Sequence, residues 1–178
     1  MKFYLKLKSW MIFWTLILSM FIPYFWIGFK SVENNWSINK MQILFFIPTW
    51  IHWTLYFVWL SFLGKALNFI DSESNLRKFK TKLTIGYIGF CFSFFPILVA
   101  FLTDTSIFDI PDIISVVSGL LFLYGLFSAF GWIIINLFKI ERKGKPKFGD
   151  YIENGFLIFF YPFGIWNIQK RVKKHINY

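Results

Sequence analysis

Four long segments of the chain contain no aspartate, glutamate, lysine or arginine. They are Ser9–Phe29, Met41–Gly64, Leu83–Thr103 and Ile113–Phe138. A helix rises 1.5 Å per residue, so about 20 apolar residues cross the hydrocarbon core of a bilayer. Aromatic residues make up 24% of the 178 residues, and a soluble domain with this composition would leave large apolar patches in water. The sequence therefore predicts an all-α integral membrane protein, with a four-helix transmembrane bundle over residues 1–138.

Basic residues are distributed very unevenly between the two sides that four spans would separate. Of the 19 lysines and arginines, only Lys30 and Lys40 fall on one side, which leaves 17 on the side that holds both termini. Because cytoplasmic loops are enriched in lysine and arginine, we expect both termini in the cytoplasm. The abundance of phenylalanine, isoleucine, lysine and asparagine favours a bacterial source, and hence the inner (cytoplasmic) membrane. Since this sidedness explains the net charge of +10, no nucleic-acid partner is expected.

Residues 139–178 form a basic cytoplasmic tail that contains a fifth apolar stretch, Phe156–Ile168. As a helix this stretch would cover only about 20 Å, and Pro162 and Gly164 interrupt it. Such short stretches are more often interfacial or re-entrant than spanning. We therefore predict that residues 156–176 form an amphipathic segment in the cytoplasmic interface, with a spanning helix as the alternative. Its basic face, expected to contact anionic lipid headgroups, consists of Lys170, Arg171, Lys173 and Lys174.

The C-terminal part of the chain has an unusual series of aromatic residues, proline and glycine. It runs Phe148-Gly-Asp-Tyr-Ile152, then Leu157-Ile-Phe-Phe-Tyr-Pro-Phe-Gly-Ile-Trp-Asn-Ile-Gln169, followed by basic residues. This tract, together with Trp59-Leu-Ser-Phe-Leu-Gly-Lys-Ala-Leu-Asn68, resembles a group of small four-span bacterial membrane proteins common in Bacteroidota. Glu153-Asn154 and Lys170 depart from that pattern, which has Gly-Glu and Pro at these places. The resemblance implies a four-span fold and no particular activity, because the group has no assigned function.

His52 lies near the centre of the second predicted span, where an ionisable residue is costly. On a helix it shares one face with Pro48 and Tyr56, and Thr49 lies beside them. This group predicts either a pore lining or proton relay, or a polar core. In the polar core, a neutral imidazole would bond to a hydroxyl or carbonyl group of a neighbouring helix.

Three prolines lie at similar depth in their predicted spans: Pro23, Pro48 and Pro96. Each removes a backbone hydrogen bond and can kink its helix. Three kinks at one level predict a water-filled vestibule in the outer half of the bundle, ending near His52. The alternative is that these are ordinary prolines of the kind that membrane helices tolerate.

Two further groups of residues lie at or near the fourth predicted span. One is a stripe of small residues that would let helix backbones approach closely, made of Ser115, Ser118, Gly125 and Ala129. This stripe predicts a packing face, against a helix of the same chain or of another subunit. The other is an outer acidic loop with Asp104, Asp109 and Asp112. These carboxylates would attract cations at a pore mouth, or Asp109 or Asp112 would cap the fourth helix.

The motifs that mark an enzyme or a cofactor site are absent from the sequence. Cys91 is the one cysteine, and no nucleotide-binding fingerprint or histidine pair at metal-ligating spacing occurs. We therefore expect no catalysis, cofactor or metal. The leading hypothesis is an oligomeric protein that forms or regulates an ion-conducting path, and the alternative is a scaffold or accessory subunit that binds a protein partner. A small lipid-acting enzyme, resting on Asp150 and Glu153, is a lesser alternative.

Overall fold

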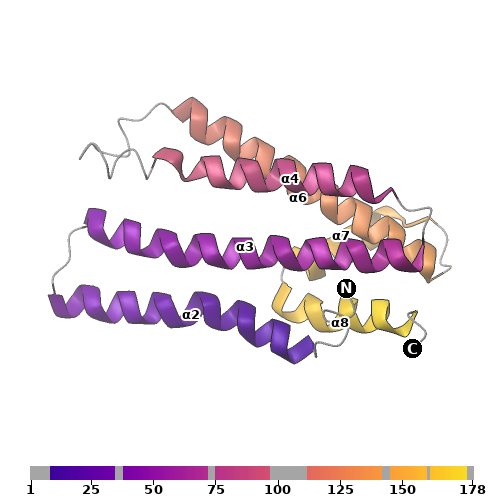
Figure 1. Cartoon of the computed structure of the whole chain (residues 1–178), viewed down its shortest axis with the longest axis horizontal. Coiled ribbons are helices and arrows are strands. Elements are labelled where there is room, and N and C mark those ends of the chain that lie inside the picture. Colours follow the sequence, from indigo (N-terminus) through magenta and orange to yellow (C-terminus); the bar gives the residue numbers. More distant parts are fainter. Residues whose placement is uncertain are drawn as a thin grey trace.

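The computed structural model describes residues 9–34, 38–71, 75–96, 112–141, 145–159 and 161–175. Within these ranges the regular structure is entirely helical, which confirms the predicted all-α class (Figure 1). The helices are α2 (Ser9–Asn34), α3 (Ile38–Ile70), α4 (Leu76–Ser93), α6 (Asp112–Ile140), α7 (Phe148–Phe159) and α8 (Tyr161–Lys174).

Three of the described helices are long and apolar enough to cross a membrane. The qualifying segments are Trp14–Asn34, Leu44–Ile70 and Ile113–Ile140. They match the first, second and fourth predicted spans and support a membrane protein. The third predicted span, 83–103, falls partly outside the described residues, because nothing beyond Pro96 is described there.

The four long helices all extend further into charged sequence than their predicted spans, and α3 and α4 do so by the greatest length. α3 continues past Lys65, whose ammonium nitrogen lies 5.4 Å from the centre of the Phe62 ring. α4 begins at Leu76, where the side chain of Asn75 accepts a hydrogen bond of 3.0 Å from the backbone N–H of Lys78. The spans were predicted from the absence of charge, but charged residues do not end a helix, and the start of α4 is fixed by its Asn75 cap.

The helices form two antiparallel pairs that pack together (Figure 1). α2 pairs with α3, α4 pairs with α6, and α3 contacts both α4 and α6. α7 packs on α6, and α8 packs on α7, α2 and α3. We call the end at which α3 ends and α4 begins the basic end, because most of the described cations lie there. They are Lys65, Arg77, Lys78, Lys80, Lys82, Lys139, Lys145, Lys147, Lys170, Arg171, Lys173 and Lys174.

The closest helix contact joins α4 to α6 through glycine. A Cβ atom on Gly125 of α6 would lie 2.2 Å from the backbone nitrogen of Gly86, and one on Gly89 would lie 2.7 Å from the carbonyl oxygen of Ser118. The two backbones are therefore in direct contact, as small residues allow. Within the predicted stripe, Ser118, Gly125 and Ala129 are buried, whereas Ser115 is exposed. The structure thus places this face against a helix of the same chain.

Candidate functional site

His52 of α3 faces α2 and is only 6% exposed. Its Nδ1 atom lies 3.1 Å from the carbonyl oxygen of Leu16 and 3.3 Å from the hydroxyl oxygen of Ser19. A carbonyl oxygen only accepts, so Nδ1 carries the hydrogen in the contact with Leu16. These contacts are the interhelical hydrogen bonds expected of a polar core. They engage Nδ1, the ring nitrogen that faces α2.

A second polar contact between α2 and α3 lies about one turn away. The Tyr24 hydroxyl contacts the Thr49 hydroxyl, which also donates to the Phe45 carbonyl at 2.7 Å. The Tyr24 and Phe45 rings lie 5.0 Å apart. We call Ser19, Tyr24, Thr49 and His52 the polar seam, since they join α2 to α3 along one line.

The polar seam bears on the predicted vestibule. Pro23 and Pro48 lie inside α2 and α3, next to Tyr24 and Thr49, and Pro48 is buried. At this level the described parts of α2 and α3 are in contact and do not splay apart. Hydroxyl groups and aromatic rings hold these two helices together beside the prolines, so α2 and α3 are closed at this level, while the vestibule of the whole outer half stays a prediction.

The C-terminal segment folds as a helical hairpin of α7 and α8 that reaches far into the bundle. The Tyr56 hydroxyl of α3 donates to the carbonyl oxygen of Ile158 at 2.6 Å. Tyr56 precedes the end of α3, Ile70, by 14 residues, so the hairpin tip lies about 21 Å along the bundle from that end. The two arms touch through backbone, because a Cβ atom on Gly164 would lie 1.5 Å from the carbonyl oxygen of Leu157.

This hairpin differs from the predicted flat segment over residues 156–176. Residues up to Phe159 belong to α7, and α8 begins at Tyr161, while residue 176 lies outside the described residues. The apolar side chains of this segment are of two kinds, because Phe156, Phe159 and Trp166 are exposed whereas three others are buried in protein. Ile158 and Ile168 are fully buried, and Val172 is 2% exposed.

An ion pair at the basic end fastens α8 to the rest of the fold. Arg171 Nε donates to Glu141 Oε1 at 2.6 Å, and Nη2 donates to Oε2 at 2.9 Å. A third guanidinium nitrogen donates to the side-chain oxygen of Asn154 on α7 at 2.5 Å. Arg171 was predicted on the headgroup-facing side, and its guanidinium is paired with Glu141 and Asn154, so the contact of this face with headgroups stays a prediction. Lys170 and Lys174 are exposed, and burial lowers the pKa of Lys173.

The structure describes only some of the carboxylates that the sequence analysis named. Asp104 and Asp109 lie outside the described residues, and Asp112 is the first residue of α6. Asp150 accepts a hydrogen bond of 2.7 Å from the backbone N–H of Lys147, so it caps the start of α7. In the described part of the chain, no group of three or more His, Cys, Asp or Glu residues could hold a metal ion.

Sequence reasoning missed several residues that organise this site. Gly86 and Gly89 make the α4–α6 contact, and their spacing of three within the third predicted span was an available sign of a packing face. Glu141 is a lone acid in a basic segment, which was a sign that it pairs with a cation. Nothing in the sequence around Asn154 indicated that it accepts a hydrogen bond from Arg171, because that contact depends on the fold of the hairpin.

Comparisons with known proteins return nothing for this chain. No protein-family model, no curated protein and no solved structure matches it.

Proposed function

We propose that this is a four-span protein of the bacterial inner membrane, with both termini in the cytoplasm. We further propose that it acts as a non-enzymatic accessory or scaffold subunit that binds another membrane chain. The observation that carries this function is the polar seam. The polar groups at its centre bond to one another across α2 and α3, so they hold the fold together and are not presented to a substrate.

The proposed topology is supported by the position of the charges along the bundle. The cations gather at the basic end, whereas Lys30 pairs with Glu33 at the opposite end of α2. Antiparallel pairing of α2 with α3 and of α4 with α6 is the arrangement that four alternating spans require (Figure 1). Labelling of single-cysteine variants tests this: a cysteine at Ser106 should react only from outside the cell, and reaction from the cytoplasm would contradict the topology.

The outer half of α2 provides a surface for another chain. A hollow of about 880 Å³ lies along this helix and is lined by Met20, Phe21, Tyr24, Phe25, Gly28, Phe29, Val32, Glu33 and Phe45. A Cβ atom on Gly28 would meet nothing within 4 Å, so there is room for a side chain of another helix. Close packing around small residues is the usual basis of helix association in membranes.

Molecular mass in mild detergent tests the scaffold function. We expect wild-type protein in solubilised membranes to migrate as a complex with a second copy or a partner at fixed stoichiometry. Gly28→Trp should dissociate that complex, because the indole would fill the hollow. Gly119→Trp is a matched control, since Gly119 also has open space around it and lies on α6, away from the hollow. A wild-type monomer, or equal behaviour of the two variants, would contradict the proposal.

A conducting path is the second candidate, and the helical hairpin favours it. Its tip meets Tyr56, which is one helical turn from His52. Re-entrant segments in membrane proteins often border a water-filled cavity. Since one copy encloses little volume, the path would form between several copies. Ion flux into proteoliposomes distinguishes the two functions: a conducting path predicts flux that His52→Ala alters, whereas a scaffold predicts none above empty vesicles.

A further inference from the structure

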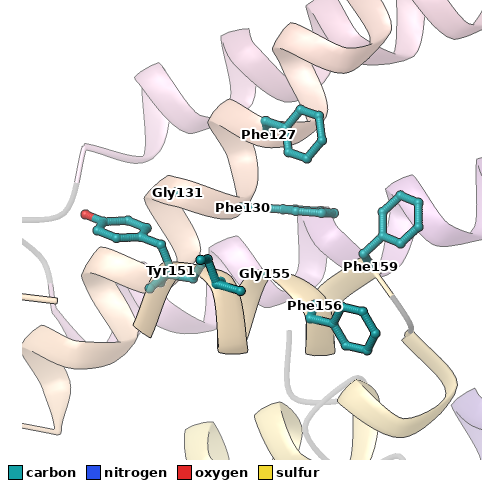
Figure 2. Close-up of a pocket in the computed structure, with 9 residues that line it drawn as sticks. Phe127, Phe130, Gly131, Tyr151, Gly155, Phe156 and Phe159 are labelled. Atoms are coloured by element: carbon teal, nitrogen blue, oxygen red, sulfur yellow. The ribbon is translucent and has the colours of Figure 1, made fainter. Parts of the chain in front are cut away.

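An apolar groove of about 450 Å³ lies between α6 and α7 (Figure 2). Its floor is formed by Phe130 and Ile134, which are 3% and 2% exposed. Its rims are formed by exposed side chains of both helices, namely Phe127, Ile152, Phe156 and Phe159. The groove is therefore a recess with a closed base that stays open towards the surroundings.

Two glycines keep this groove open. Gly131 of α6 and Gly155 of α7 both line it, and a Cβ atom on either one would meet nothing within 4 Å. These glycines differ from Gly86 and Gly125, which are needed for the close contact of two helices. The space beside Gly131 and Gly155 is consequently free for a ligand.

The groove has one polar end and one apolar end. The Tyr151 hydroxyl points away from the phenylalanine rings (Figure 2), and Tyr151 lies about one turn from Lys147 at the start of α7. Lys145 and Lys147 are exposed at the basic end. Phe159, at the other end, is next to the hairpin tip where Ile158 meets α3. The groove thus runs from cations at the basic end towards the middle of the bundle.

The size of the groove indicates what it holds. Tyr151 and Phe159 are about 12 Å apart along α7, so a volume of about 450 Å³ corresponds to a cross-section of about 40 Å². A helix about 10 Å in diameter needs about twice that cross-section. The groove is therefore narrower than a helix and has the width of a single extended hydrocarbon chain.

We propose that the groove binds one acyl chain of an anionic phospholipid, whose phosphate lies against Lys145 and Lys147. Apolar walls match the hydrocarbon chain, and the two lysines match the negative charge. Basic sites between membrane helices on the cytoplasmic side are known to bind anionic headgroups. This inference rests on the proposed cytoplasmic position of the basic end and not on the scaffold function, because α2 and its hollow take no part in it.

Photolabelling of the full chain tests the site. The protein is reconstituted in phosphatidylcholine bilayers that contain a small fraction of phosphatidylglycerol with a photoactivatable acyl chain, and labelled peptides are identified by mass spectrometry. We expect label in residues 127–134 and 151–159. The variant Gly131→Leu with Gly155→Leu should lose this label, because leucine side chains occupy the groove. Gly119→Leu should keep it, since Gly119 has open space and does not line the groove.

A second pair of measurements tests the headgroup. With the same label on phosphatidylcholine, wild-type protein should be labelled more weakly in the groove than with phosphatidylglycerol. Lys145→Gln with Lys147→Gln should reduce this preference by about fivefold for each lysine, and both side chains are exposed, so folding is unaffected. Equal labelling of wild type by both lipids would show general lipid contact only and overturn the proposal. Equal labelling of the double-leucine and Gly119→Leu proteins would overturn it as well.

Discussion

Replacing Arg171 with leucine should loosen α8 from the bundle. The guanidinium makes two hydrogen bonds to the Glu141 carboxylate and one to Asn154. The Glu141 side chain is only 8% exposed, and that of Arg171 is 22% exposed. Removal of the arginine therefore takes two charge-assisted hydrogen bonds from a nearly buried carboxylate, and breaking a buried ion pair from one side is among the most destabilising single changes a fold can undergo.

The size of the effect follows from this burial. Removing one partner of a buried ion pair costs about 3–5 kcal/mol, and we take about 3 kcal/mol because Arg171 is partly exposed. Since about 1.4 kcal/mol corresponds to a factor of ten, local opening of α8 should become about a hundredfold more frequent. The double variant Arg171→Leu with Glu141→Leu should lose only about 1 kcal/mol, because it leaves no buried charge.

Hydrogen exchange of the α8 amides measures this opening in purified protein. Lys170→Leu is a matched control, since Lys170 precedes Arg171 in the same helix and its side chain is exposed. The reasoning is refuted if the Arg171→Leu and Lys170→Leu proteins exchange α8 amides at the same rate. It is also refuted if the double variant exchanges faster than Arg171→Leu alone, because the buried carboxylate would then not be the cause.

Three further substitutions test the close contacts. Gly164→Ala should push α8 away from α7 and cost at least about 1–3 kcal/mol, whereas Gly155→Ala should have little effect, as read from thermal unfolding in detergent. Gly125→Ala should similarly separate α4 from α6, with Gly119→Ala unchanged, and equal melting temperatures in that pair would count against the glycine contact. Tyr56→Phe removes the hydrogen bond to the hairpin tip and should cost about 1 kcal/mol, seen as faster exchange at the end of α7 without a change elsewhere.

The fold was predictable wherever composition alone decides it. Long runs without charge identify helices that avoid water, and α2, α3 and α6 each contain one predicted span in full. The ends of the helices were less predictable. The Asn75 cap starts α4 within charged sequence, and α3 continues past Lys65, which lies over the Phe62 ring. A side-chain cap or a contact between a lysine and an aromatic ring can be recognised in a sequence only when the helix is already known to include those residues.

Individual residues of the candidate site could be predicted from the sequence, but the contacts between distant residues could not. The burial and hydrogen bonding of His52 agree with a polar core, which was one of two open interpretations. The partner of Arg171 could not be deduced, because Glu141 lies 30 residues away and meets it only through the hairpin. Amphipathic spacing shows that one face of α8 is apolar, but it does not distinguish burial in lipid from burial against other helices.

The polar contacts of α3 are neutral near the centre of the helix and charged at the basic end. This difference indicates where the proposed membrane would end along α3. Towards the centre of the helix, the contacts of Thr49, His52 and Tyr56 that join it to other segments involve hydroxyl, imidazole and carbonyl groups. At the basic end, Asp71, the residue that follows α3, pairs with Lys139 at 2.7 Å. Neutral contacts are stable in hydrocarbon, whereas charged groups need the interface, so the proposed topology puts the cytoplasmic boundary of the membrane between Tyr56 and Asp71. If it falls near Lys65, the hairpin tip at Tyr56 lies about 14 Å inside the hydrocarbon. The bond from Tyr56 then satisfies a backbone carbonyl that has no water to bind, which is the condition for a re-entrant hairpin to persist there.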